Sequence, residues 1–472
     1  MNSERNGMQI NDSRIGSNQR TIYNTHYVKF RTCNLSLLKN PIMKSRSRRS
    51  FLQDTVFGGA LLGLAPRTHR SLFASQPPRE SVRIGMIGVG NQGGPKNNMK
   101  YFLKNIVALC DLDKNYLGEA SDFLQKEASL KATQTDDYRR LLDAKDIDAV
   151  VVTVPDQWHA LMTIEACKAG KDVYCEKPLT LTIGEGKPMI AAARRYKRVV
   201  QTGTMQRSGV EFKLAVDLVQ QGLVGKVHSV NVTLPSPNWI ARAKSPVPNS
   251  APPDGFDYDR WLGPAPFRPF NKNHVHYLFR FYWDYSGGQQ TNFGAHHLDI
   301  AQWGLGMDEN GPTSVEGTAV YNPDGWYETP DTTNIRYTYA NGVVMTCQQK
   351  LDTKSSDQGT EFVGDKGNLF VYRGGIVANP PELLKGIEVP KIVNSQANSK
   401  HVNNFLDCVK SREKPVADIA IGHSSATVCH LGNIAIRSGK KITWDPKTET
   451  IVGDPEGAKW LTKDYRAPYK LG

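Results

Sequence analysis

The stretch VRIGMIGVGNQGG, residues 82–94, decides the fold of this chain. An apolar run typical of a β-strand leads directly into the pattern Gly88-x-Gly90-x-x-Gly93. In a dinucleotide-binding turn the first glycine permits the tight turn and the second lets the backbone approach a pyrophosphate. The third allows a following helix to pack closely, with its N-terminus facing the phosphates. We therefore expect cofactor contacts from Gly88, Gly90, Asn91, Gln92 and Gly93.

A glycine pattern alone is weak evidence, so its surroundings have to support it. A second apolar run, residues 106–110, ends at Asp111, about 20 residues beyond the glycines, which is the spacing of a βαβ unit. A carboxylate at this position accepts hydrogen bonds from the adenosine ribose and repels a 2′-phosphate, so we expect NAD rather than NADP. The alternative is a glycine-rich turn in an unrelated α/β domain.

The same alternation of strands and helices continues through the next hundred residues. The apolar periodicity predicts helices at 137–143, 158–169 and 184–196, and strands at 149–154, 172–175 and 199–203. Loops then follow strands at Pro155, Glu176 and Gly203, at the carboxyl edge of a parallel sheet, where ligands bind. We predict a Rossmann domain over residues 80–203, with further cofactor contacts from Pro155, His159, Glu176 and Lys177.

With Glu176-Lys177-Pro178 included, the chain from Val82 to its C-terminal region resembles the glucose–fructose oxidoreductase/inositol dehydrogenase (Gfo/Idh/MocA) family. The resemblance rests on the order and spacing of VRIGMIGVGNQG, ALCDLDK, TVPDQWH, YCEKPLT, GTMQRS and GGQQTNFGAHHLDIAQW. It implies an α/β protein with an N-terminal Rossmann domain and a C-terminal α/β domain built on an open, mostly antiparallel sheet. It also implies a sugar, inositol or related substrate, and a homo-oligomer formed through the outer face of that sheet.

Hydride transfer from a carbinol needs a base for the hydroxyl proton and a positive group near the developing alkoxide. Lys177, on a loop expected near the nicotinamide, can hydrogen-bond the reacting oxygen, and Glu176 can orient it. By resemblance to the family's Asp-x-Gly-x-His element, His296 is the general acid/base. Asn292 stands four residues earlier, where the family usually has Asp, and an amide can orient a group but cannot take its proton.

Two further residues are candidate substrate ligands. Arg207 follows a predicted sheet-edge loop, and His297 either lines the substrate site or is structural. We predict no metal site, because adjacent histidines diverge on a helix and His296, His297 and Asp299 lack metal-ligand spacing. The segment 235–285 is rich in proline and aromatic residues, which suit either stacking on sugar rings or packing.

The second domain is predicted over residues 204–445, with substrate and oligomer contacts. Its strands alternate between Thr313 and Tyr372, helices at 401–411 and 421–437 close the fold, and a tail covers 446–472. The seven cysteines are scattered without a CxxC pair, and we interpret Cys110, Cys167 and Cys175 as small buried apolar residues.

The formal net charge of +13 is concentrated at the N-terminus. Residues 1–74 hold twelve basic and three acidic residues, so the rest of the chain is nearly balanced and nucleic-acid binding is not expected. Residues 45–53 resemble a twin-arginine export signal, with Arg48 and Arg49 followed by an apolar run too short to span a membrane. We expect cleavage after Ala74 or Ser75, a true start at Met43, and export to the periplasm by the twin-arginine machinery.

Together these features predict an exported oxidoreductase that passes hydride between NAD and a hydroxyl carbon of a sugar, polyol or glycoside. Because free NAD is scarce outside the inner membrane, we expect the enzyme to retain its cofactor. An NAD-dependent glycosidase acting through transient C3 oxidation and elimination is the alternative. A non-catalytic sugar-binding relative is a third possibility.

Overall fold

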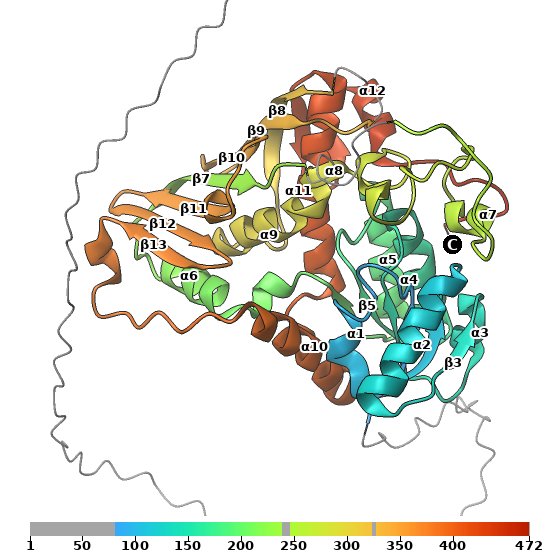
Figure 1. Cartoon of the computed structure of the whole chain (residues 1–472). Helices are drawn as coiled ribbons and strands as arrows, with labels where there is room; N and C mark the ends of the chain where they lie inside the picture. The colour runs from blue at the N-terminus through green and yellow to red at the C-terminus, as the bar shows by residue number, and fades with distance from the viewer. Residues whose placement is uncertain (1–80, 238–245, 323–326, 472) are drawn as a thin grey trace, which may run out of the picture. The chain divides into compact units, whose positions relative to one another are not determined.

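The structure is a computed structural model that describes residues 81–237, 246–322 and 327–471 (Figure 1). The predicted twin-arginine signal, its cleavage site and Met43 lie outside the described residues. No helix among the described residues is long and apolar enough to cross a membrane.

The first part of the described chain is a parallel sheet with strand order β3-β2-β1-β4-β5-β6. Strands β1, β4 and β5 are buried along their whole length, as expected of a sheet covered on both faces. The strands are β1 Ile84–Ile87, β2 Ile106–Cys110, β3 Thr133–Thr135, β4 Ala149–Val152, β5 Asp172–Cys175 and β6 Val200–Thr202. The helices are α1 Met99–Phe102, α2 Lys114–Ala128, α3 Tyr138–Asp143, α4 His159–Lys168 and α5 Gly186–Arg195.

The second sheet has the order β13-β12-β11-β7-β10-β9-β8-β14-β15, and all its neighbours are antiparallel except β7 and β10. Its strands are β7 Val227–Leu234, β8 Pro312–Val320, β9 Thr332–Tyr339, β10 Val344–Gln349, β11 Gly359–Gly364, β12 Gly367–Tyr372, β13 Gly375–Asn379, β14 Ile442–Asp445 and β15 Thr450–Ile451. Helices α6 Val210–Gln220, α9 Gly294–Gly304 and α11 Ile419–Ser438 share its apolar core. The predicted fold class is therefore confirmed.

Helix α10, Asn394–Ser411, lies in sequence between strands β13 and β14 of the second sheet but packs on the first. The ring of Phe405 lies 5.8 Å from that of Tyr174 on β5 and 6.5 Å from that of Phe102 on α1. Figure 1 shows α10 beside α1. A helix beyond residue 390 thus completes the core of the Rossmann sheet, because that sheet has an apolar face that its own helices leave uncovered.

The aromatic segment that includes α7, Tyr258–Leu262, forms a small core of its own. Trp261, Tyr282 and Tyr285 are buried, and their rings lie within about 6.5 Å of aromatic neighbours. Of the two interpretations of this segment, packing accounts for these three rings. The remaining helices are α8 Gly288–Asn292 and α12 Pro455–Ala458.

The C-terminal residues return to the aromatic segment. Arg466 donates hydrogen bonds to the carbonyl oxygens of Gly263 and Asp259 and pairs with the Asp259 carboxylate at 2.6 Å. Figure 1 accordingly shows the C-terminal end of the chain near α7. The C-terminal tail, which begins at residue 446, is thus held by hydrogen bonds to the aromatic segment of the same subunit.

Candidate active site

The glycine loop closes tightly on the end of strand β4. Gly88 has φ +83°, and its N–H donates to the Cys110 carbonyl at 2.8 Å. A Cβ on Gly93 would lie 1.9 Å from the Gly88 oxygen and 2.3 Å from Thr153 Oγ1. The Thr153 hydroxyl also donates to the Gly88 carbonyl. Side chains are thus sterically excluded from this cradle, which fits a loop that brings backbone against a pyrophosphate.

The helix after this loop is short and begins at Met99. Residues 91–98 form turns, and α1 spans only Met99–Phe102 before a 3-10 turn at Leu103–Asn105. Pro95 interrupts helical hydrogen bonding, because proline has no N–H to donate. The helix that follows the glycines therefore begins only at Met99, after a series of turns.

Asp111 lies at the end of β2 and lines the cleft beside the glycine loop. Its carboxylate accepts hydrogen bonds from the backbone N–H groups of Val89 at 2.7 Å and Asp113 at 3.0 Å. Burial raises its pKa to about 6, against these hydrogen bonds, which lower it. The carboxylate is thus fixed to the loop, and the remaining lone pairs of its two oxygens can accept hydrogen bonds from ribose hydroxyls.

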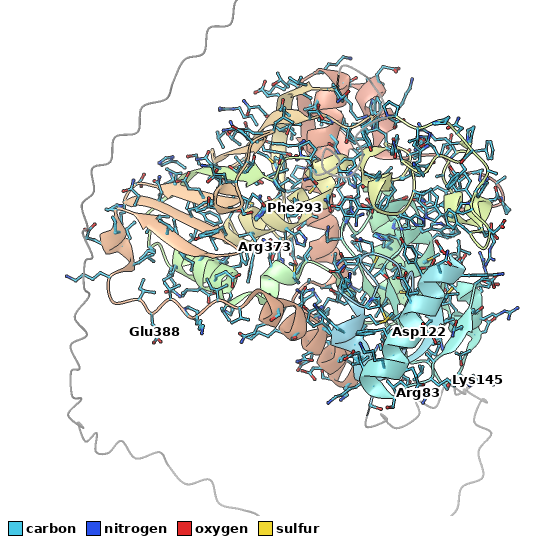
Figure 2. The ribbon with its side chains drawn as sticks, viewed as in Figure 1. Arg83, Asp122, Lys145, Phe293, Arg373 and Glu388 are labelled. Carbon is cyan, nitrogen blue, oxygen red and sulfur yellow. The ribbon has the colours of Figure 1, made fainter. Side chains whose placement is uncertain are left out.

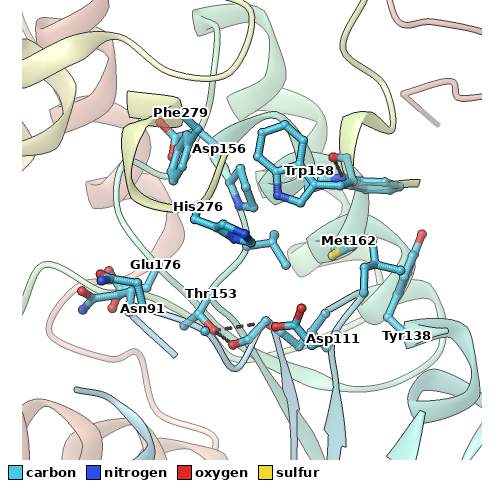
Figure 3. Close-up of a pocket in the computed structure, with 18 of the residues that line it drawn as sticks. Asn91, Asp111, Tyr138, Thr153, Asp156, Trp158, Met162, Glu176, His276 and Phe279 are labelled. Carbon is cyan, nitrogen blue, oxygen red and sulfur yellow. Dashed lines mark hydrogen bonds between the residues drawn. The ribbon is translucent and has the colours of Figure 1, made fainter. Parts of the chain in front are cut away.

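A cleft of about 1220 Å³, including the part open to solvent, runs along the carboxyl edge of the parallel sheet. Figure 3 shows Asp111 and Tyr138 toward one end and Asn91 and Glu176 toward the other, with Trp158 above. The predicted residues that line it are Gly88, Gly90, Asn91, Gln92, Asp111, Pro155, Glu176, Lys177 and Asn292. The cleft therefore has the glycine turn, the ribose carboxylate and the Glu-Lys-Pro loop along one surface.

The cover of this cleft comes from distant parts of the chain. Phe256, Trp261, His276 and Phe279 line it from the aromatic segment, and Tyr469 lines it from the C-terminal tail. The Tyr469 ring packs edge-on against Trp158 with 5.1 Å between ring centroids. The cleft is therefore lined both by the Rossmann domain and by segments far from it in sequence.

Lys177 of the Rossmann domain is hydrogen-bonded to Asn292 of the second domain. Its Nζ donates to Asn292 Oδ1 at 2.8 Å and to the Asn292 carbonyl at 2.9 Å. Asn292 is itself held by Gln289, whose Oε1 accepts from Asn292 Nδ2 at 2.8 Å. Burial, and then the charge of Arg280, lower the pKa of Lys177 to about 8.

A second cavity of about 930 Å³ opens on the other side of Lys177. Residues common to both cavities are Asn91, Gln92, Glu176, Lys177, Arg280 and Asn292. His296 lines only the second cavity, and its Nδ1 is buried with no hydrogen-bond partner among the described residues. Burial and the charges of Arg373 and Lys177 hold the pKa of His296 well below its ordinary value, so the ring is neutral near pH 7.

His159 lies behind the cleft rather than in its lining. Its ring nitrogens lie 2.7 Å from the Pro178 carbonyl oxygen and 2.9 Å from the Val154 carbonyl oxygen. The ring is buried and bridges the two loops that carry the cofactor-facing residues. The prediction that His159 touches the cofactor is corrected: its position makes it a residue that holds the loops in place.

Arg207 and His297 also lie outside the lining of both cavities. The Arg207 guanidinium pairs with Asp299 at 2.8 Å and Asp308 at 2.6 Å. His297 is buried, and burial lowers its pKa to about 3. The prediction that Arg207 binds substrate is corrected, because two carboxylates already occupy its donors. For His297 the structural role is the one that its position supports.

Several lining residues were missed by sequence reasoning. Asp156 lines the cleft and accepts a hydrogen bond from Ser286, and burial raises its pKa to about 7. Asp156 could have been predicted from its position directly after Pro155, just beyond the end of β4. Tyr277, Arg280 and Arg373 line the second cavity without any local motif. Within the described residues, no cluster of His, Cys, Asp or Glu is arranged to hold a metal ion.

Comparison with protein families agrees with this geometry. Residues 82–204 match the NAD-binding Rossmann fold of an oxidoreductase family, and residues 208–471 match its C-terminal alpha/beta domain. The chain belongs to the Gfo/Idh/MocA oxidoreductase family. Its cofactor is NAD, and the residues that would hold it are those of the glycine cradle, Asp111 and the Glu-Lys-Pro loop.

Individual Gfo/Idh/MocA relatives match to different extents. An uncharacterized oxidoreductase, YrbE of Bacillus subtilis, is 27% identical over 76% of this chain and 92% of its own length. A glycosyl hydrolase family 109 protein of Shewanella pealeana is 31% identical over 32% of this chain, and the chain spans only 34% of that relative. That partial match is about the size of one domain.

Solved structures show the same fold. A levoglucosan dehydrogenase solved with NADH and levoglucosan aligns with a TM-score of 0.58 at 18% identity, over 76% of this chain and 98% of its own. An oxidoreductase from Thermotoga maritima aligns with a TM-score of 0.58 at 20% identity, over 77% of this chain and 98% of its own. Both therefore share the overall fold of this chain.

Proposed function

We propose that this protein transfers hydride between retained NAD and a hydroxyl carbon of a sugar, polyol or glycoside. The observation that carries the proposal is the position of Lys177 and Asn292, which line both the NAD cleft and the cavity that contains His296. A carbinol at this junction meets a lysine ammonium and a neutral imidazole from the two domains.

Bound NAD supplies a hydride acceptor for the carbinol carbon, or a donor in the reverse direction. In the oxidising direction the neutral His296 accepts the hydroxyl proton at Nε2, because a neutral ring nitrogen can act as a base. Lys177 donates a hydrogen bond from Nζ to the same oxygen as negative charge develops on it. Asn292 holds Lys177 in place through two accepting oxygens 2.8 and 2.9 Å from Nζ.

Retention of the cofactor follows from the cover of the cleft. The aromatic segment and Tyr469 line the cleft opposite the Rossmann domain. Release requires these packed elements to separate, so we expect slow exchange of bound NAD with NAD in solution. Slow exchange suits an enzyme that is exported already folded with its cofactor.

The direct test is an absorbance spectrum of the purified protein before and after adding a panel of sugars, polyols and aryl glycosides, with no added cofactor. We expect the near-ultraviolet band of reduced nicotinamide to appear with at least one member of the panel. A protein without bound nucleotide that also takes up no added NAD overturns the proposal.

We also propose export by the twin-arginine route to the periplasm. The support is the order of Arg48-Arg49, Phe51-Leu52 and a short apolar run in the sequence. Replacing Arg48 and Arg49 together by lysine is expected to keep the protein in the cytoplasm, as read by cell fractionation. Periplasmic recovery of that variant overturns this part.

A homo-oligomer is proposed as well, through the outer face of the nine-stranded sheet. Val320 on β8 and Val377 on β13 are large apolar residues with 63% and 54% of their surface exposed. We expect sedimentation analysis of the mature protein to give more than one subunit, and a V377E variant to lower the assembly state. A monomer at micromolar concentration contradicts the proposal.

A glycosidase acting through transient oxidation is the second candidate. It is favoured by relatives of about 32% identity named alpha-N-acetylgalactosaminidase and glycosyl hydrolase family 109 protein, although each match covers only about a third of the relative. Release of the aglycone from an aryl glycoside without net formation of reduced NAD distinguishes this candidate from a dehydrogenase. Net reduction of NAD without release of the aglycone excludes it.

A further inference from the structure

Arg373 is a partly buried cation with no carboxylate within ion-pair distance among the described residues, although the charge of Glu211 acts on it from further away. It follows β12 at the turn into β13 and lines the second cavity. Its Nε donates to Gln206 Oε1 at 3.0 Å, and its guanidinium lies 5.3 Å from the centre of the Phe293 ring. Figure 2 labels Arg373 and Phe293 close to one another. No described residue accepts a hydrogen bond from its two terminal amino groups, and desolvation lowers its pKa to about 10.

Arg207 is an example of a structural arginine in this fold, paired with carboxylates. Its guanidinium, almost fully buried, is neutralised by Asp299 and Asp308 at 2.8 and 2.6 Å. Burying an uncompensated charge costs several kcal/mol, so a structural arginine is normally paired in this way. Arg373 has no hydrogen-bonded carboxylate of this kind in the described chain, and a ligand can provide one.

The cavity around Arg373 has an excess of basic side chains. Lys100, Lys177, Arg280 and Arg373 line it, and Glu176 is its one acidic lining residue within the described chain. The Glu176 carboxylate already accepts hydrogen bonds from Asn98 Nδ2 at 2.7 Å and from the Lys177 N–H at 3.2 Å. The space beside Lys177 therefore favours an anion over a neutral molecule of the same shape.

Arg373 is also fixed relative to the predicted base. Gln206, which accepts from Arg373 Nε, donates from its Nε2 to the His296 carbonyl at 3.3 Å. The amide of Gln206 thus connects the guanidinium to helix α9, which carries His296. The two terminal amino groups form a planar fork that matches a carboxylate through two parallel hydrogen bonds.

We propose that the substrate is an acidic sugar, a hexuronic acid or its glycoside, whose carboxylate binds the Arg373 fork while a ring hydroxyl reaches Lys177 and His296. This inference rests on the proposed function and adds the substrate class to it. A sugar phosphate presents the same anionic oxygens, so the test has to separate the two sources of charge.

The experiment is a calorimetric titration of the NAD-loaded protein with matched ligands. In each of the gluco, galacto and manno series, the methyl hexuronide is compared with the neutral methyl hexoside and with the hexose 6-phosphate. We expect the hexuronide of one series to bind at least about 10-fold more tightly than its neutral partner, because hydrogen bonds between charged groups are stronger than those between neutral groups. The preference should weaken as salt concentration rises.

Variants assign the preference to Arg373. We expect R373Q to lower the hexuronide-to-hexoside affinity ratio about 10- to 100-fold, and R373K, which keeps the charge and loses the fork, to lower it less. Arg195 is exposed on α5 and lines neither cavity, so R195Q is the matched control and should keep the ratio unchanged. Thermal unfolding of each variant separates loss of affinity from loss of fold.

The outcomes separate the two proposals because binding is measured without turnover. Hexuronide binding that depends on Arg373 supports the substrate class even if no ligand reduces the bound NAD, which would contradict the proposed function alone. Equal or tighter binding of the neutral hexosides in all three series overturns the substrate class, as does absence of hexuronide binding. Tighter binding of the 6-phosphate overturns the assignment of a carboxylate.

Discussion

Replacing Asn292 by aspartate should move the alkaline limit of activity to higher pH. Lys177 Nζ lies 2.8 Å from Asn292 Oδ1, and the pKa of this lysine is lowered to about 8. Because the protonated ammonium donates to the developing alkoxide, kcat/KM for alcohol oxidation should fall as pH rises through about 8. Asn292→Asp puts a carboxylate against the ammonium, raises its pKa and keeps it protonated at higher pH.

The size of the shift can be worked from the distance. Two unit charges 2.8 Å apart attract by about 6 kcal/mol at an effective dielectric constant of ~20, and the cost of burying a second charge offsets part of this. Adjacent opposite charges commonly shift a pKa by about 1–3 units. The pKa of Lys177 should therefore rise from about 8 to roughly 9–11.

The substitution also has a structural cost that can be measured separately. Asn292 Nδ2 donates to Gln289 Oε1 at 2.8 Å, so aspartate places two acceptors together until the Gln289 amide turns over. Gln289 Nε2 in turn donates to the Ser236 carbonyl at 2.8 Å. We expect N292D to lose about 1–3 kcal/mol of unfolding free energy, visible as a lower Tm.

The assay is a pH profile of kcat/KM from the absorbance of reduced nicotinamide, with any substrate that reduces the bound cofactor. Asn403 is exposed on α10 and lines neither cavity, so N403D makes the same change of net charge as a matched control. We expect the alkaline limb near pH 8 in the native protein and in N403D. An N292D profile with its alkaline limb at the native position refutes the assignment of that limb to Lys177.

Four further substitutions test the rest of the site. Lys177→Met should lower kcat about 100- to 1000-fold by steady-state assay, because it removes the donor to the developing charge. Gly93→Ala should abolish the bound NAD found after acid release, whereas Gly118→Ala, with nothing within 4 Å of its new Cβ, should retain it. Asp111→Asn should raise the affinity for NADP relative to NAD by about 10-fold or more in fluorescence titrations, because it removes like-charge repulsion. Tyr469→Ala should speed NAD release about 2- to 10-fold in stopped-flow displacement, because it removes the aromatic contact with Trp158.

The Rossmann half was predictable because its signals are local. The glycine turn and Asp111 belong to one βαβ unit, and Pro155 and Glu176 each come just after a strand, so the residues next to them in sequence indicated them. The contact of Gly88 and Gly93 with Thr153 was not visible in this way. A helix after the glycines was predicted without bounds, and the structure gives it only the four residues Met99–Phe102, after Pro95. Local sequence patterns thus predicted where the helices and strands lie more accurately than they predicted how long each one is.

The cover of the Rossmann sheet was not predictable in the same way. The sequence predicted a helix at 401–411, close to the described α10, but not that it packs on β5 and α1. An apolar helical face shows that a partner exists without showing which sheet supplies it. Tyr469 likewise lines the cleft although it lies more than 300 residues after β4 in the sequence, so no local pattern indicated its contribution.

Arg207 and Arg373 show why the net charge of a binding site is hard to predict from sequence. Arg207 does follow a strand edge as predicted, yet its partners Asp299 and Asp308 stand 92 and 101 residues away. Arg373 has no motif around it, yet Gln206, 167 residues away, turns it toward the cavity of His296. An arginine binds a ligand only where the fold leaves its donors without carboxylates, and that balance is set by tertiary neighbours. The substrate class is therefore better inferred from Arg373, whose terminal amino groups donate to no carboxylate in the described chain, than from Arg207, which stands nearer a motif.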